Sequence, residues 1–88
     1  MVEHDDGPQL AWLVKNLRKA RALTQEDLAE RSKLASDTIR RLEHGEFSPS
    51  LKTLRKLCAG LSLSLSGLFV SLELGDMREA DIDELVNS

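Results

Sequence analysis

The chain has 88 residues, 41% of them hydrophobic and 31% charged, with a formal net charge of −3, and this size allows one small domain with a modest core. No apolar run approaches the length of a membrane span, and the first residues are acidic where a secretory signal would be basic, so we expect a cytoplasmic protein without a membrane segment. The single cysteine, Cys58, excludes an internal disulfide, and Cys and His are too few for a structural zinc site, so we expect neither a metal nor a cofactor.

The first predicted helix spans residues 9–21. Pro8 suits the first turn of a helix because its missing N–H costs nothing there. Leu10, Val14 and Leu17 follow at helical spacing, which places them on one face. We therefore expect this face to pack into the core.

Two short helices joined by a tight turn are predicted next. Thr24 is expected to cap the first, because its hydroxyl can accept from a backbone N–H and Asp27 resembles the return half of a capping box. This helix should end near residue 31 or 32, and the second should span residues 36–44 and stop at Gly45, a natural left-handed residue. Apolar residues give these helices inward stripes: Leu28, Ala29, Leu34, Ile39 and Leu42.

The next segment predicts a fourth helix and a less regular fifth element. Apolar residues recur at three- and four-residue steps over residues 51–61, after Pro49 and Ser50, which indicates a helix. Leucine and serine alternate over residues 61–69, and periodicity alone favours a strand there. Gly67, the short length and the helical neighbourhood favour instead a short helix. Its expected cap is Ser64, and its expected inward residues are Leu65, Leu68 and Phe69.

The last part of the chain gives weaker signals. Residues 69–74, with the sequence FVSLEL, alternate again and could form an extended segment. Residues 76–86 are acidic and offer few apolar side chains for burial. We therefore expect a frayed helix or a disordered tail there.

Charge is distributed unevenly along the chain. Residues 1–8 carry −3 and residues 73–88 carry −5, whereas the stretch between them carries eleven Lys and Arg against six Asp and Glu, a net charge of +5. Local field rather than net charge governs contact with a polyanion, so a basic body of this kind favours nucleic-acid binding. We predict an acidic N-terminal tail at 1–8, a DNA-binding domain at 9–71 and an acidic C-terminal tail at 72–88.

Four motifs at fixed spacing support one family resemblance. They are LTQEDLA, IRRLEHG, PSLKTLRKL and SLSGLF, in that order along the chain. Together they resemble the lambda-repressor-like, Cro/Xre-type helix-turn-helix family over about residues 10–69. The resemblance implies an all-α, compact five-helix DNA-binding domain with its helix-turn-helix at the second and third helices.

In such a motif the third helix lies in the major groove of DNA and presents its N-terminal residues to base edges. Carried over by position, the candidates for base contact are Ser36, Asp37, Thr38, Arg40 and Arg41. Arg41 is the first choice, because a guanidinium can bind guanine O6 and N7 together. Asp37 could accept from cytosine N4 or could simply be a carboxylate favoured by the helix dipole.

The resemblance also implies contacts to the DNA backbone. The candidates for phosphate contact are Thr24, Gln25, His44, Ser48, Ser50 and Lys52. Gln25 matches a phosphate-binding position of the family and could also brace the start of the third helix, while Thr24 could add its own backbone N–H. For Lys52 a solvated surface lysine is the alternative. These contacts set register and do not choose sequence.

The resemblance has two further implications, which concern the structure of the domain rather than its contacts with DNA. Arg18 and Glu43 resemble the family's buried ion pair between the first and third helices, which would fix the tilt of the third helix. Ala22 and Lys33 stand where the family often has glycine, so a left-handed backbone at each would cost about 1 kcal/mol.

We expect a sequence-specific transcriptional regulator of double-stranded DNA, a repressor that binds a palindromic operator as a homodimer, and not an enzyme. The dimer surface is expected from Leu68, Val70, Leu72 and Leu74, or from an extended segment 69–74 that pairs with its two-fold mate. The alternative is an antitoxin or regulatory subunit whose main role is to bind a protein partner, for example through the acidic C-terminal tail.

Overall fold

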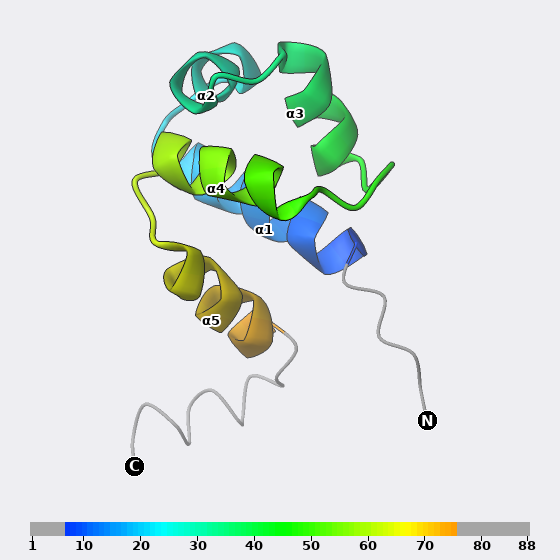
Figure 1. Ribbon diagram of the computed structural model, residues 1–88, viewed down its shortest axis with the longest axis vertical. Helices are drawn as coiled ribbons and strands as arrows, with labels where there is room; N and C mark the ends of the chain where they lie inside the picture. Colours follow the sequence, from blue (N-terminus) through cyan, green and yellow to red (C-terminus); the bar gives the residue numbers. More distant parts are fainter. Residues whose placement is uncertain (1–6, 76–88) are drawn as a thin grey trace.

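The computed structural model describes residues 7–75 of the chain, which form five helices and no strand. Their bounds are α1 (Gly7–Ala20), α2 (Gln25–Ser32), α3 (Ser36–Glu43), α4 (Leu51–Gly60) and α5 (Leu65–Gly75). Helices α2 and α3 lie together at one end, α4 lies in front of α1 in this view, and α5 lies at the other end (Figure 1). The prediction of an all-α, five-helix fold is confirmed.

Side-chain caps start three of the helices as the sequence predicts. The Thr24 hydroxyl accepts from the Asp27 N–H at 3.0 Å, and the Thr24 N–H donates to Asp27 Oδ2 at 2.9 Å, which completes a capping box at α2. Hydrogen bonding of the Asp27 carboxylate to Thr24, first to its backbone N–H, holds the pKa of Asp27 below its usual range. Ser50 accepts from the Thr53 N–H at the start of α4, and Ser64 accepts from the Gly67 N–H at the start of α5.

Three helices end on a non-glycine residue with a left-handed backbone. These residues are Ala22, Lys33 and Ser62, with φ of 55°, 56° and 55°. A leucine follows each of them, and its N–H returns to the carbonyl five residues earlier at 2.9 to 3.1 Å, as in a Schellman motif. The left-handed backbone expected at Ala22 and Lys33 is confirmed, and Ser62 adds a third site of about 1 kcal/mol of strain.

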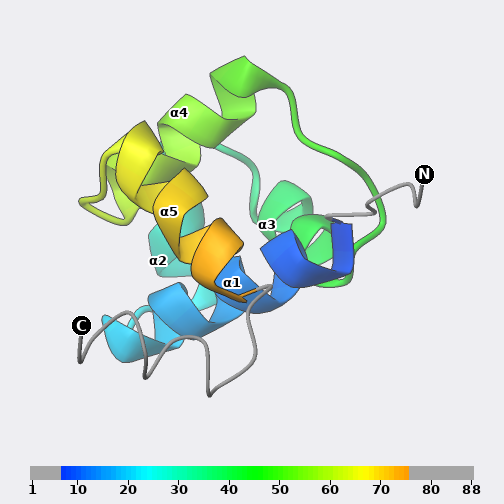
Figure 2. The same cartoon turned by 90° about the horizontal axis from the view of Figure 1, so that it is seen from below.

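The core is built from the inward stripes of all five helices. Its fully buried apolar side chains are Val14, Leu28, Ile39, Leu42, Leu57, Leu61 and Leu68. The inward positions predicted for α2 and α3 are thus confirmed, and Leu34 is partly buried against the same cluster. Viewed from below, α5 lies beside α1 and α4 and closes the core on the side away from α3 (Figure 2).

Several predictions for residues 65–75 are wrong because one continuous helix replaces a short one. FVSLEL is helical rather than extended, since Leu65, Leu68 and Leu72 recur at three- and four-residue steps and pack on the core. Phe69 falls off that stripe and is 43% exposed, whereas Leu68 is only 1% exposed and leaves no area for a dimer surface. A two-fold sheet of extended 69–74 segments is excluded by the same helix.

The element boundaries also differ in detail. Helix α1 begins at Gly7 and ends at Ala20, about two residues ahead of the prediction at its start. Helix α5 continues to Gly75, past the position at which the C-terminal tail was predicted to begin. The predictions for residues 1–6 and 76–88 lie outside the described residues. Within residues 7–75 no single helix is long and apolar enough to cross a membrane, and α4 and α5 meet that criterion only as a pair bent by 94°.

Helices α2 and α4 approach each other most closely at Gly60. A β-carbon at this position would collide with Ser32 Oγ and would lie 3.1 Å from both Leu28 Cδ1 and the Ser32 backbone nitrogen. Ser32 is buried, and its hydroxyl finds no hydrogen-bond partner among the described residues. Glycine is therefore required at position 60 because there is no room for a side chain. Ser32 fills space at this contact, and its hydroxyl makes no hydrogen bond with the described residues.

We expect Gly60→Ala to lower the free energy of unfolding by about 1 to 3 kcal/mol, because the added methyl overpacks the contact between α2 and α4. Ser32→Ala alone should be nearly neutral, and in combination it should restore part of the loss by making room for the methyl. Urea unfolding of the three variants measures both effects. Equal stability of Gly60→Ala and the wild type would contradict the close approach.

Candidate nucleic-acid interface

Helix α3 turns one face to the core and the opposite face to solvent. Ile39, Leu42 and Glu43 are buried against the rest of the domain. Of the five candidates for base contact, Ser36, Asp37, Arg40 and Arg41 are exposed and Thr38 is half-buried. The amphipathic character of α3 thus gathers all five on or beside one open face, next to the N-terminal end of α2 (Figure 1).

Arg41 is held by two neighbours that the sequence analysis did not single out. Its guanidinium carbon lies 5.5 Å from the centroid of the Phe47 ring, within the range of a cation–π contact. Its Nε lies 3.6 Å from Glu46 Oε1. The two terminal nitrogens of the guanidinium, Nη1 and Nη2, are the donors that could bind a guanine. Phe47, an aromatic residue soon after Gly45, is the feature of the sequence that could have indicated the contact with Arg41.

Arg40 is paired with Asp37 on the same helix. Arg40 Nε and Nη2 both donate to Asp37 Oδ1, at 3.2 and 2.5 Å. This pairing holds the pKa of the Asp37 carboxyl below its usual range and raises the pKa of Arg40. The spacing of three residues along a helix predicts such a pair, and the sequence analysis did not use it.

The candidates for phosphate contact at the start of α2 are already engaged within the protein. The Thr24 N–H, which could have served a phosphate, donates to Asp27 instead. Gln25 is half-buried, and its Nε2 donates to Glu43 Oε1 at 3.2 Å. Gln25 therefore braces α3 at Glu43, the last residue of that helix, and not at its start as expected. Its contact with phosphate stays a prediction.

The other phosphate candidates lie around the connection between α3 and α4. His44, Ser48, Ser50 and Lys52 are all exposed. The His44 Nδ1 lies 3.7 Å from Glu46 Oε2, and the Ser50 hydroxyl caps α4. Lys52 stands in the first turn of α4 and makes no ion pair with the described residues. All four lie along the chain between the end of α3 and the first turn of α4.

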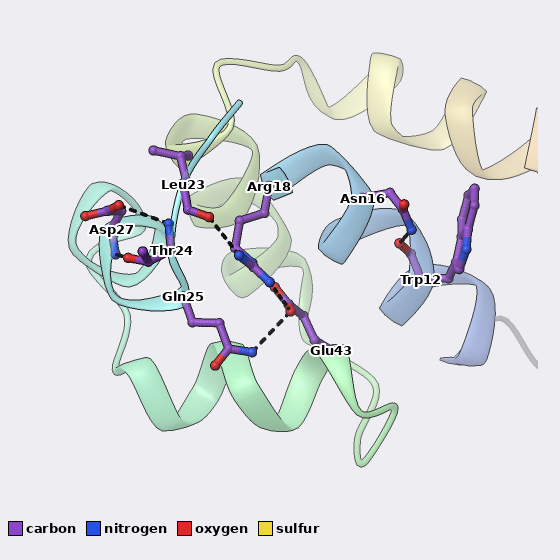
Figure 3. A network of polar contacts seen from close by, with 8 residues as sticks. All are labelled: Trp12, Asn16, Arg18, Leu23, Thr24, Gln25, Asp27 and Glu43. Atoms are coloured by element: carbon purple, nitrogen blue, oxygen red, sulfur yellow. Dashed lines mark hydrogen bonds and ion pairs between the residues drawn. The ribbon is translucent and has the colours of Figure 1, made fainter. Parts of the chain in front are cut away.

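A buried ion pair joins α1 to α3 (Figure 3). Arg18 Nε donates to Glu43 Oε2 at 2.7 Å, and Arg18 Nη2 donates to Glu43 Oε1 at 3.0 Å. Arg18 Nη1 also donates to the Leu23 carbonyl at 2.7 Å. The two side chains are only 10% and 2% exposed. The hydrogen bond to Glu43 raises the pKa of Arg18, which favours the charged form of the guanidinium.

Other side chains give little support for chemistry. Cys58 is a free, buried cysteine, and burial raises the pKa of its thiol, which disfavours the reactive thiolate. No group of three His, Cys, Asp or Glu within residues 7–75 could hold a metal ion. The features that remain are an exposed polar helix with two arginines, a second helix whose N-terminal end lies beside it, and a buried ion pair that joins the exposed helix to α1. They define a helix-turn-helix DNA-binding domain.

Comparison with known proteins agrees with this class. Residues 14–68 match the model of the helix-turn-helix family. The chain therefore belongs to the helix-turn-helix family, in its lambda-repressor-like, Cro/C1-type branch, and it is a DNA-binding transcription regulator by class.

Two relatives come from Bacillus phage phi105. The immunity repressor protein is 34% identical over 55 residues, which cover 62% of this chain but only 38% of that protein. The chain thus spans well under half the length of that relative. The ImmF control region 10 kDa protein is 32% identical over 63 residues, which cover 72% of this chain and 70% of that protein.

Solved structures of the restriction-modification controller protein C.Esp1396I are also similar. The protein bound to a 19-base-pair DNA duplex superimposes with a TM-score of 0.79 at 25% identity, covering 85% of this chain and all of that one. The C.Esp1396I tetramer in complex with its natural 35-base-pair operator gives a TM-score of 0.77 at 27% identity, covering 83% and 96% of the two chains. These named relatives are regulators rather than enzymes.

Proposed function

We propose that the protein is a sequence-specific transcriptional repressor that binds a palindromic operator as a homodimer. The observation that carries this proposal is the exposed face of α3, where Arg40 and Arg41 are each supported by neighbouring side chains. Supported guanidinium groups suit recognition of guanine in the major groove, because less side-chain entropy is lost on binding. The flanking polar residues would set the register on the DNA backbone.

The relatives support repression and operator binding. One is named an immunity repressor, and the controller protein is bound to its operator as a tetramer. A basic body with a net charge of +5 over residues 9–72 suits a polyanionic partner. Repression follows from competition for a promoter when the operator overlaps it.

The homodimer would form through exposed apolar side chains of α5. Phe69 and Val70 are 43% and 54% exposed, and Leu72 and Leu74 are half-buried. A single module of this size covers limited DNA surface, and two-fold pairing doubles the contacts across half-sites about one helical turn apart. Helix α5 lies at the end of the domain away from α2 and α3 (Figure 1), so pairing through α5 would leave both recognition helices accessible.

Selection of bound sequences from a random DNA pool tests the proposal. We expect an enriched palindromic motif whose half-sites are separated by about 10 base pairs or a multiple of this. Sedimentation of the protein with the selected duplex should give two chains, or a multiple of two, per site. Recovery of no motif at low salt would contradict sequence-specific binding, and an asymmetric motif bound by one chain would contradict the homodimer.

A further inference from the structure

The ion pair between Asp37 and Arg40 leaves one donor edge of the arginine free. A guanidinium presents two forks, one formed by Nε with a terminal nitrogen and one formed by the two terminal nitrogens. Asp37 Oδ1 occupies the first fork, because it accepts from both Nε and Nη2. Glu46 Oε2 lies 3.9 Å from Nη1, which is too far for a hydrogen bond. The fork of Nη1 and Nη2 therefore remains available to a ligand.

The pair lies in a shallow hollow between the N-terminal ends of α2 and α3. The hollow is lined by Gln25, Glu26, Ser36, Asp37 and Arg40. Gln25 is a candidate for phosphate contact, whereas Ser36 and Arg40 are candidates for base contact. A phosphate contact and a base contact are thus both expected at the hollow that Arg40 lines, and Asp37 fixes one edge of the Arg40 guanidinium there.

Stability does not account for this pair. Arg40 and Asp37 are 48% and 64% exposed, and exposed ion pairs contribute little to folding. A carboxylate in the first turn of α3 is favoured by the helix dipole, but the dipole does not explain why one oxygen binds both nitrogens of a fork. Both hydrogen bonds go to Asp37 Oδ1, and among the described residues Asp37 Oδ2 has no hydrogen-bond partner.

We propose that Asp37 is a specificity-determining positioning residue, which withholds Arg40 from phosphate and presents its free fork to a guanine. This inference rests on the proposed function, because it concerns how the same face of α3 chooses a sequence. In the free protein Asp37 compensates the charge of Arg40. Random DNA therefore gains little counterion release from Arg40, whereas a guanine at the correct position gains two aligned hydrogen bonds.

The inference is tested with Asp37→Asn, which keeps the shape of the side chain and removes its charge. Binding is measured over a salt series to the selected operator and to a random duplex of equal length. We expect tighter binding to random DNA, a salt slope steeper by about one, and a ratio of operator to random affinity reduced about tenfold. Glu30→Gln is the matched control, because it removes an exposed carboxylate from α2 without touching Arg40.

A double-mutant cycle separates positioning from simple charge. In the Arg40→Gln background Asp37→Asn should cause no further loss of discrimination, since there is no guanidinium left to hold. Additive losses would overturn the inference, and so would equal effects of Asp37→Asn and Glu30→Gln on both duplexes. If the wild type itself prefers no sequence, the proposed function and this inference both fail. If the wild type selects a motif that Asp37→Asn binds with unchanged discrimination, only the inference fails.

Discussion

Glu43→Ala is expected to lower the free energy of unfolding by about 3 to 5 kcal/mol, because it leaves the Arg18 guanidinium buried and without its partner. Each kcal/mol lowers the melting temperature of a domain this size by about 4 to 8 °C, so the change is large. Thermal melting followed by circular dichroism measures it. Arg18→Ala should be destabilised to a similar degree, since it leaves the Glu43 carboxylate in the same position.

Two controls show whether the unpaired charge causes the loss. Glu46→Ala removes an exposed carboxylate three residues later and should cost no more than about 1 kcal/mol. A double variant, Arg18→Met with Glu43→Leu, removes both charges and should be more stable than either alanine variant. Unchanged melting temperatures in both Glu43→Ala and Arg18→Ala would show that the pair does not stabilise the domain.

The same pair connects stability to DNA recognition. Glu43 lies on the buried face of α3, and it receives hydrogen bonds from α1 through Arg18 and from α2 through Gln25. The angle of α3 is thus fixed from both neighbouring helices (Figure 3). A variant of Glu43 that still folds at low temperature should bind all DNA sequences less tightly, because α3 no longer has one defined tilt.

Arg41→Ala is expected to reduce discrimination at one base pair of the operator by about 1 to 3 kcal/mol, roughly five- to 150-fold, because a bidentate contact to guanine is lost. The Phe47 ring and Glu46 hold the Arg41 side chain in the free protein, so this side chain loses little conformational entropy when it binds DNA. Fluorescence anisotropy with the selected duplex and its single-base variants measures the effect.

Lys52→Ala is the matched control for that experiment. Lys52 is exposed in the first turn of α4 and is a candidate for phosphate contact only. Its removal should weaken binding to every sequence by about the same factor and lower the salt slope by about one. If Arg41→Ala and Lys52→Ala behave alike, the division between base contact and phosphate contact is wrong.

The sequence predicts the fold well where local chemistry and tertiary packing agree. Capping residues placed the starts of α2, α4 and α5, and apolar stripes placed the buried faces of α2 and α3. The left-handed helix ends at Ala22 and Lys33 were also expected, because the resemblance places a turn at each. These are short-range signals that the core then reinforces.

The errors arose where two periods fit one short segment. The sequence FVSLEL satisfies a period of two, but it continues the helix predicted just before it because Leu72 packs on the core together with Leu65 and Leu68. Contacts between side chains on the surface were harder still to predict from the sequence. The contact of Arg41 with Phe47 depends on the path of the loop after α3, which no local pattern specifies.

The most direct test of the central claim, that α3 reads base edges in the major groove, replaces single guanines of the selected operator with 7-deazaguanine. This change removes the N7 acceptor and leaves base pairing intact. The account predicts one position at which wild-type affinity falls about tenfold while Arg41→Ala is unaffected. Equal binding of the wild type to every substituted duplex would contradict recognition of guanine by α3.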